Sequence, residues 1–242
     1  MTCGRIILFA GILCLANDLF GQANAFNTLT KKEKKEGWKL LFNGKTTEGW
    51  RNYKSDNIGP AWKVKDGALF FDTSSKKDGK IVGGGSIITK EQFKDFEFSV
   101  DWKIEPCGNS GILFNVTEEG AVEWNTGPEM QVLDNACHPD SKFPKHRAGN
   151  LYDLIASKTE SVHLAGEWNT ARIVSDKGHL ELWLNDVRQV EIEMFTPEWD
   201  ALIGSSKFKD IPIFGKARQG HICLQDHDNQ VWFRNIKIRR LG

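Results

Sequence analysis

The sequence is short of several features that mark familiar classes of protein. Its 242 residues include only two Tyr, three Met and five Cys. Lys and Arg together number 32, and so do Asp and Glu. Binding to nucleic acid or to an anionic membrane depends on a basic excess, which this chain does not have. A ligand of this protein is therefore neutral, or is recognised by local groups rather than by the overall field.

Several catalytic motifs are also missing. The chain has no G-x-S-x-G elbow, no phosphate-binding glycine loop and no metal-type cysteine spacing. The run Gly83–Gly85 instead predicts a flexible turn before a strand. The Glu-x-Asp-x-x-Glu pattern of many β-sandwich glucanases is absent, because Glu129-Met130-Gln131 matches only its first half. The spacing therefore does not support a glycosidase with paired carboxylates.

The only long apolar run lies at the N-terminus. Arg5 precedes the apolar stretch Ile6–Ala16, and Ala23–Ala25 forms a small-x-small cleavage pattern. This arrangement predicts that residues 1–25 are a signal peptide, too short to span a bilayer. The alternative is a lipoprotein signal at Cys14, although the residue before it is larger than such signals favour. We expect a periplasmic or extracellular protein.

The mature chain, residues 26–242, is expected to form one domain with three cysteines. Outside the cytoplasm a disulfide is allowed, and Cys107 and Cys137 both lie beside loop residues. We expect these two to pair, with three free thiols as the alternative. Cys223 lies in an apolar run and is expected to act as a small buried hydrophobe.

Short runs with period-two alternation dominate this domain and predict an all-β fold with about a dozen strands. Dipeptides such as Asp66-Gly67 and Asn185-Asp186 mark turns between them. Thr30–Gly37 and a segment beginning at Thr196 predict one or two short helices. The expected architecture is two antiparallel sheets packed face to face, with one concave face. The predicted strands are Trp38–Asn43, Trp62–Lys65, Ala68–Asp72, Ser86–Thr89, Phe96–Glu105, Gly111–Val116, Glu129–Asp134, Leu151–Ile155, Ala171–Ser175, His179–Asn185, Arg188–Glu193, His221–Gln225 and Val231–Arg239.

One predicted strand carries polar residues suited to sugar binding or proton transfer. Side chains alternate along a strand, so Glu129 and Gln131 share one face while Met130 and Val132 point into the core. A merely solvated strand face explains the same pattern equally well.

A loop after this strand gathers titratable residues. His138, Asp140, His146 and Arg147 follow it within the segment Asp134–Arg147. Histidine carries protons near neutral pH, and arginine is a permanent donor for an oxyanion. A divalent metal held by His138, His146 and a carboxylate is an alternative, although the spacing matches no standard zinc site.

The remaining histidines are divided between the site and the scaffold. His227 lies just after a strand, between two aspartates, and is either a turn residue or a site residue. His163, His179 and His221 are expected to be structural or to lie on the surface.

Several blocks of the chain resemble the 3-keto-disaccharide hydrolase family, also described as 3-keto-glucoside lyase/hydratase domains. The blocks are Gly37–Lys45 with Gly49-Trp50, Asn109–Ile112, Glu129–Asp134, His138–Asp140, Ala148–Ile155, Gly166–Asn169 and Gly220–Ile238. The resemblance implies a concanavalin A-like β-sandwich (jelly roll) and export by bacteria. Asn150 stands where many members carry a smaller residue.

The resemblance also implies a reaction: elimination from a sugar oxidised at C3, followed by hydration. Such a route needs one base and an enolate stabiliser rather than paired carboxylates. From residue chemistry we expect His138 as base, Arg147 or a bound cation as stabiliser, and Glu129 or Asp134 as acid or orienting group. The residues expected to bind the substrate are Gln131, His146, Tyr152, Gln225 and His227.

Three readings remain open: this enzyme, a lectin-like domain on the same fold, or a conventional glycoside hydrolase. The expected partner is a carbohydrate, with no nucleic acid and no membrane span. The sequence requires no cofactor and leaves the oligomeric state open.

Overall fold

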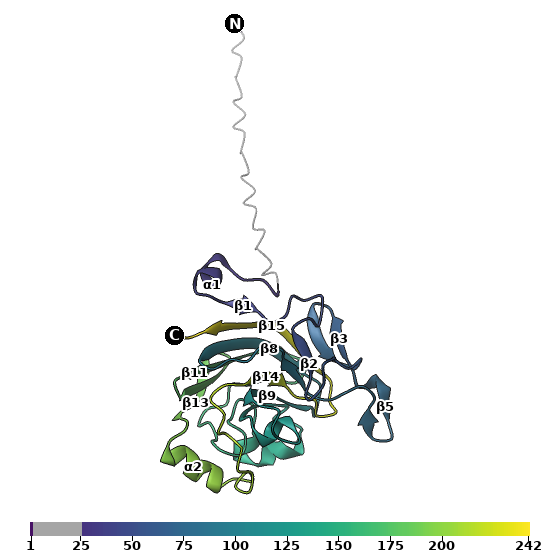
Figure 1. Ribbon diagram of the computed structural model, residues 1–242. Coiled ribbons are helices and arrows are strands. Elements are labelled where there is room, and N and C mark those ends of the chain that lie inside the picture. The colour runs from purple at the N-terminus through teal and green to yellow at the C-terminus, as the bar shows by residue number, and fades with distance from the viewer. Residues whose placement is uncertain (2–25) are drawn as a thin grey trace.

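The structure is a computed structural model that describes Met1 and residues 26–242 (Figure 1). The predicted signal peptide and the alternative lipoprotein cysteine, Cys14, lie outside the described residues. Within the described part of the chain, no helix has the length and apolar character needed to cross a membrane.

Two antiparallel sheets form the body of the molecule, as the alternation predicts. The larger sheet has eight strands in the order β13-β12-β11-β8-β15-β4-β3, with β1 paired to β15. The smaller sheet has five, in the order β10-β9-β14-β7-β2. The strands of the larger sheet are β1 (Lys39–Leu40), β3 (Trp62–Lys65), β4 (Ala68–Phe71), β8 (Phe96–Ile104), β11 (Asn169–Asp176), β12 (His179–Leu184), β13 (Val187–Glu193) and β15 (Val231–Arg240). Those of the smaller sheet are β2 (Trp50–Asn52), β7 (Ile87–Thr89), β9 (Asn109–Val116), β10 (Glu129–Leu133) and β14 (His221–Leu224).

The remaining elements are short. A two-stranded hairpin pairs β5 (Lys76–Lys77) with β6 (Lys80–Ile81). The α-helices are α1 (Lys31–Lys35) and α2 (Pro197–Gly204). Four 3-10 turns complete the structure: η1 (Thr73–Ser75), η2 (Glu123–Asn125), η3 (Pro139–Lys142) and η4 (Pro144–His146).

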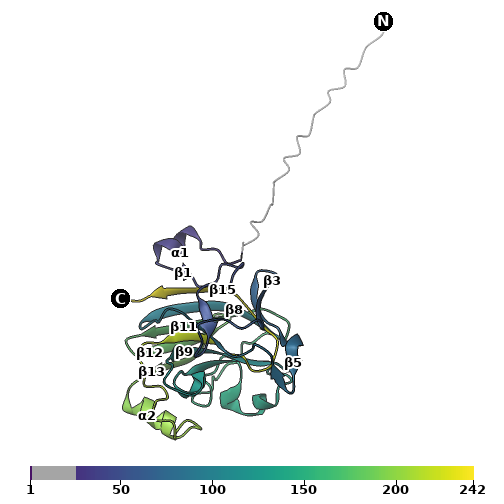
Figure 2. The same ribbon diagram turned by 45° about the vertical axis from the view of Figure 1, so that its right-hand side comes forward.

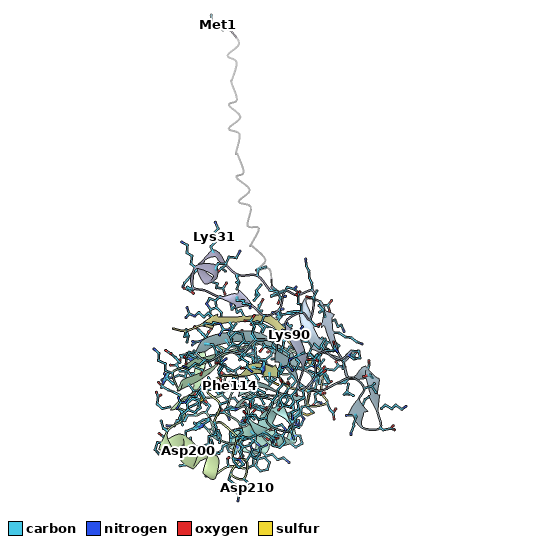
Figure 3. All side chains as sticks on the ribbon, in the orientation of Figure 1. Met1, Lys31, Lys90, Phe114, Asp200 and Asp210 are labelled. Atoms are coloured by element: carbon cyan, nitrogen blue, oxygen red, sulfur yellow. A yellow bond between two sulfur atoms is a disulfide. The ribbon has the colours of Figure 1, made fainter. Side chains whose placement is uncertain are left out.

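The core lies between the two sheets. Phe98 and Trp102 of β8 point inward from the larger sheet, and Phe114 of β9 points inward from the smaller one. Figure 3 shows Phe114 in the interior, whereas Asp200 and Asp210 lie at the periphery. Met130 and Val132 of β10 join this core, as predicted. Two inner faces that bury alternating side chains are the expected arrangement of a sandwich.

Local sequence signals place several turns and helix ends as expected. Thr30 and Glu33 form the predicted capping box of α1, and Thr196 caps α2 through Trp199 N. Asp66 and Gly67 both adopt positive φ, 50° and 73°, as a tight hairpin turn requires.

One predicted strand is wrong. Leu151–Ile155 forms only isolated bridges, from Leu151 to Met130 and to Ile155. Asp153 adopts a φ of 60°, and the amides of Leu154 and Ile155 both bond back to the Leu151 carbonyl. The chain therefore turns here instead of continuing extended.

The predicted disulfide between Cys107 and Cys137 is present, with 4.7 Å between the two Cα atoms. Cys223 is a buried free thiol, also as predicted. Burial raises the pKa of this thiol well above its ordinary value, so it stays protonated.

Long connections cover the outer face of the five-stranded sheet. Figures 1 and 2 show the segment around η2 to η4 and the segment around α2 on the side of β9 and β14 that faces away from the larger sheet. These segments bury side chains that the alternation alone leaves exposed. Glu129 and Gln131 are 7% and 1% exposed, so the expected open strand face is in fact enclosed.

Candidate functional site

A cavity of about 150 Å³ lies on the outer face of the five-stranded sheet. Its floor comes from β9, β10 and the end of β14, and its walls come from the covering segments. The lining residues are Asn109, Glu123, Trp124, Glu129, Gln131, Tyr152, Lys207, Phe208, Gln225, Asp226 and His227. A small, polar, concave site with convergent titratable groups is the usual form of a site for a small ligand.

A glycine makes room for the central carboxylate. Gly111 of β9 pairs with Gln131 of β10. A Cβ at Gly111 would lie 2.3 Å from Oε1 of Glu129, so any larger residue would displace that carboxylate. The Glu129 side chain therefore lies across the neighbouring strand, on the floor of the cavity.

Glu129 has the most informative environment in the cavity. Its carboxylate has no hydrogen-bond partner among the described residues, and burial raises its pKa to about 8. The positive charge of Lys207 opposes this rise, while Glu123 and Asp140 add to it. A carboxyl group that titrates close to neutral pH can accept and return a proton.

Three buried primary amides lie on the same floor: Asn109, Gln131 and Gln225. Gln131 Oε1 accepts the amide of Val132 at 3.0 Å. Asn109 Oδ1 is buried and has no hydrogen-bond partner within the described chain. The Nδ2 atom of the same amide lies 3.5 Å from Nε2 of His227, so the Asn109 side chain contacts another residue that lines the cavity.

A linked set of side chains supports the wall beside Glu129. The Lys207 ammonium lies 4.1 Å from the centre of the Tyr152 ring, and the Lys207 backbone amide donates to Asp153 at 2.7 Å. His146 bonds to Asp153 at 2.9 Å and stacks on Tyr152. The Tyr152 hydroxyl donates to Asp140 at 3.1 Å. Tyr152 thus lines the cavity as predicted, whereas His146 lies behind it and holds its ring.

His138 lies near the cavity without lining it. Its Nδ1 accepts the backbone amide of Asp140 at 3.1 Å and so caps η3. Burial lowers the pKa of His138, and neighbouring His227 lowers it further. The neutral ring therefore carries its proton on Nε2, where it acts as a donor rather than a base.

The structure does not bring Arg147 and Asp134 into the cavity. Nη2 of Arg147 contacts both carboxylate oxygens of Glu160, at 2.8 and 2.6 Å. Asp134 accepts the backbone amides of Cys107 at 2.8 Å and Ala136 at 3.1 Å. Both side chains hold loops together.

The predicted histidine pair also has no metal-binding geometry. Within the described chain, two groups of three potential ligands have ligand atoms within 4.8 Å of one another. One is Cys107, Asp134 and Cys137, and the other is His179, Glu181 and Glu191. Neither includes His138 or His146.

Sequence reasoning missed six cavity residues: Asn109, Glu123, Trp124, Lys207, Phe208 and Asp226. Asn109 is the first residue of the block Asn109–Ile112, so of these six it was the easiest to predict as a site residue from the sequence. Trp124 and Lys207 come from connections with no repeating pattern, so only the fold could reveal them.

Known proteins resemble this chain along most of its length. The model of the 3-keto-alpha-glucoside-1,2-lyase-like domain matches residues 37–239. A Bacteroides thetaiotaomicron protein named 3-keto-disaccharide hydrolase is 34% identical over 229 residues, which cover 85% of this chain and 79% of that protein.

Solved structures agree with this match. A Parabacteroides distasonis protein, named as a candidate glycosyl hydrolase, superposes with a TM-score of 0.82 and 32% identity, covering 90% of this chain and 100% of that one. A Bacillus subtilis protein with a galectin-like fold (TM-score 0.50, 12% identity, 89% and 94% covered) supports the β-sandwich architecture alone. Because the family model spans residues 37–239 and the 34% identical relative covers 85% of the chain, this chain belongs to the 3-keto-alpha-glucoside-1,2-lyase-like domain family.

Proposed function

We propose that the protein is a carbohydrate-active enzyme that cleaves 3-keto-disaccharides, with hydrolysis as the net result. Family membership and the 3-keto-disaccharide hydrolase relative support the substrate class. The observation that carries the mechanism is Glu129, a buried carboxyl group with a pKa of about 8 on the cavity floor.

The proposed reaction proceeds by elimination and hydration. A ketone at C3 acidifies the C2 hydrogen, and a base removes it as a proton. The electron pair of that C–H bond first forms an enolate and then the C1–C2 double bond, while the C1–O bond breaks. The leaving group departs with the C–O electron pair and takes up a proton. Water then adds across the double bond, with hydroxide at C1 and a proton at C2, to give the free 3-keto sugar.

Glu129 is the proposed base in place of His138. Its ionised form lies unpaired in the cavity, whereas Nδ1 of His138 is already occupied by the Asp140 amide. Lys207 takes the role expected of Arg147, because this residue lines the cavity and its positive charge acts electrostatically on Glu129. A cation there stabilises negative charge that develops on the enolate oxygen. The cavity amides and His227 hold sugar hydroxyls.

The test uses trehalose and its 3-keto form with the full mature chain. Turnover of the keto sugar alone supports the proposal. Cleavage of unoxidised trehalose supports a conventional glycosidase, and binding without turnover supports a lectin. In D₂O the elimination route introduces deuterium at C2 of the product, beyond that taken up by the free 3-keto sugar without enzyme. Direct hydrolysis introduces none.

Matched variants assign the base. Glu129→Gln is expected to abolish turnover, with a loss of at least about a hundredfold, because general bases contribute roughly 10²–10⁴ to the rate. Glu119→Gln alters an exposed carboxylate outside the cavity and is expected to keep full activity. Full activity of Glu129→Gln would show that another residue is the general base, and His138→Ala would be the next variant to assay.

Export to the periplasm or the medium is part of the proposal. The basic residue, apolar run and cleavage pattern within residues 1–25 support it, and so does the Cys107–Cys137 disulfide, since such bonds persist in oxidising compartments. Fractionation of cells that express the tagged full chain tests this. Retention of an uncleaved product in the cytoplasm would contradict it.

A further inference from the structure

An exposed tryptophan lies at the rim of the cavity. Trp124 is 39% exposed and lines the pocket. Among the six large hydrophobic residues exposed in the described chain, it is the one that borders this cavity. Tryptophan combines a large flat apolar face with one N–H donor, a combination that is enriched where proteins contact their partners.

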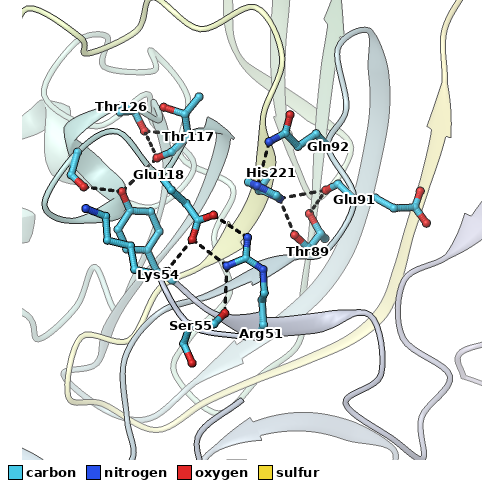
Figure 4. A network of polar contacts seen from close by, with 12 residues as sticks. Arg51, Lys54, Ser55, Thr89, Glu91, Gln92, Thr117, Glu118, Thr126 and His221 are labelled. Atoms are coloured by element: carbon cyan, nitrogen blue, oxygen red, sulfur yellow. Dashed lines mark hydrogen bonds and ion pairs between the residues drawn. The ribbon is translucent and has the colours of Figure 1, made fainter. Parts of the chain in front are cut away.

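The segment that carries Trp124 is fixed by polar contacts, many of which Figure 4 shows. Arg51 of β2 forms a two-pronged ion pair with Glu118, at 2.8 and 2.7 Å. The Tyr53 hydroxyl donates to the Thr117 carbonyl at 3.1 Å, and Thr126 accepts the Thr117 amide at 3.0 Å.

Hydrogen bonds also fix the backbone on both sides of Trp124. Asn125 Oδ1 accepts the amides of Ala121 and Val122, at 3.0 and 3.2 Å. The Glu123 carboxylate accepts the Ser86 hydroxyl at 2.8 Å. Trp124 is therefore presented on a rigid backbone, and little conformational entropy is lost when a ligand packs against it.

We propose that Trp124 forms the subsite for the leaving group, and that this group is a neutral pyranose ring. The inference rests on the proposed function, because it assumes that C1 of the 3-keto sugar lies near Glu129.

The two ends of the cavity orient the substrate. The Glu129 carboxylate lies over Gly111 of β9, and Asn109 lies two residues further along the same strand, about 7 Å along the sheet. Glu123 acts electrostatically on Glu129, so the segment of Trp124 borders the Glu129 end. The Asn109 side chain lies towards the other end, beside His227. With C2 at Glu129, the remote hydroxyls of the keto sugar reach Asn109 and His227, and the group on C1 lies towards Trp124.

The chemistry at this end matches a second sugar. The flat indole packs against the C–H face of a pyranose, and Oε2 of Glu123 has no hydrogen-bond partner among the described residues and can accept a hydroxyl. Three carboxyl groups line the cavity (Glu123, Glu129 and Asp226) against one ammonium, that of Lys207. This excess of acidic groups favours a neutral leaving group over an anionic one.

The experiment compares a 3-keto-disaccharide with methyl 3-keto-glucoside, whose leaving group has no ring. Trp124→Ala is expected to lower kcat/KM for the disaccharide about tenfold, mainly through KM, because one ring-stacking contact is lost. The methyl glycoside is expected to react at the wild-type rate. Trp124→Phe keeps an aromatic face and restores most of the activity on the disaccharide.

Controls separate this inference from the proposed function. Trp183→Ala removes an outward-facing tryptophan of β12 in the other sheet and is expected to change neither substrate. Equal losses on both substrates, or none on the disaccharide, would overturn the subsite while leaving the proposed function standing. Equal wild-type turnover of a disaccharide with a uronic acid leaving group would overturn its neutral character. Wild-type inactivity on both keto sugars would overturn the function itself, and the subsite with it.

Discussion

Replacing Glu129 with glutamine should change how protein stability depends on pH. Burial raises the pKa of Glu129 from an ordinary 4.5 to about 8 in the folded protein. Between these two values the folded state holds a proton that the unfolded state has released. Stability is therefore fully present below pH 4.5 and falls as the pH rises towards 8. Glutamine does not titrate, so the variant lacks this loss.

The size of the effect follows from the gap between the two pKa values. Each pH unit corresponds to about 1.4 kcal/mol, so the full gap costs the wild type on the order of 5 kcal/mol by pH 9. For a domain of this size, about 1 kcal/mol shifts the Tm by roughly 2–4 °C. Glu129→Gln is thus expected to melt roughly 10–20 °C above the wild type at pH 9, with little difference at pH 4.

The assay is thermal unfolding of both proteins by circular dichroism from pH 4 to pH 9. Every other titrating group is common to the two proteins, so the difference between their curves isolates Glu129. Parallel curves across the whole range would refute the reasoning, because they would mean that the carboxyl group ionises as easily in the folded protein as in the unfolded chain.

Further substitutions test the neighbours of this group. Glu129 must ionise to act as base, so kcat/KM should rise with pH with a midpoint near 8. Lys207→Met should move that midpoint upward, because it removes the positive charge that favours the ionised carboxylate. Gly111→Ala should abolish turnover while leaving the sheet folded, since the new Cβ would lie 2.3 Å from the carboxylate; an active variant would contradict this. Asn109→Ala should raise KM about tenfold with little change in kcat, measured on the 3-keto-disaccharide. Cys137→Ser opens a disulfide that spans 30 residues and should cost about 3 kcal/mol in urea unfolding at pH 7.

The fold was predictable from the sequence because its signals are local. Alternation along β8 and β11, the hairpin at Asp66-Gly67 and the cap at Thr196 each depend on neighbouring residues alone. Leu151–Ile155 failed for the opposite reason. Its composition suits a strand, but Asp153 takes up a left-handed conformation. Its carboxylate bonds to His146 and accepts the backbone amide of Lys207, which lies 54 residues further along the chain.

The site was predictable only in part. Glu129, Gln131, Tyr152, Gln225 and His227 line one cavity, and alternation indicated the shared face of the first two. The loop residues could not be assigned in this way, because loop contacts are not periodic. The guanidinium of Arg147 is engaged by Glu160, and the Asp134 carboxylate caps the loop of the disulfide.

Burial, rather than residue type, decides which titratable group in this molecule suits proton transfer at neutral pH. Histidine has the right pKa in water, yet Nδ1 of His138 is committed to a backbone amide and burial lowers its pKa. Glutamate has the wrong pKa in water, yet enclosure by the covering segments raises that of Glu129 to about 8. The covering segments come from connections between strands, and the glycine that leaves space for the carboxylate comes from β9. The environment of the proposed base thus depends on β9, on β10 and on the covering segments, which become neighbours only in the folded protein.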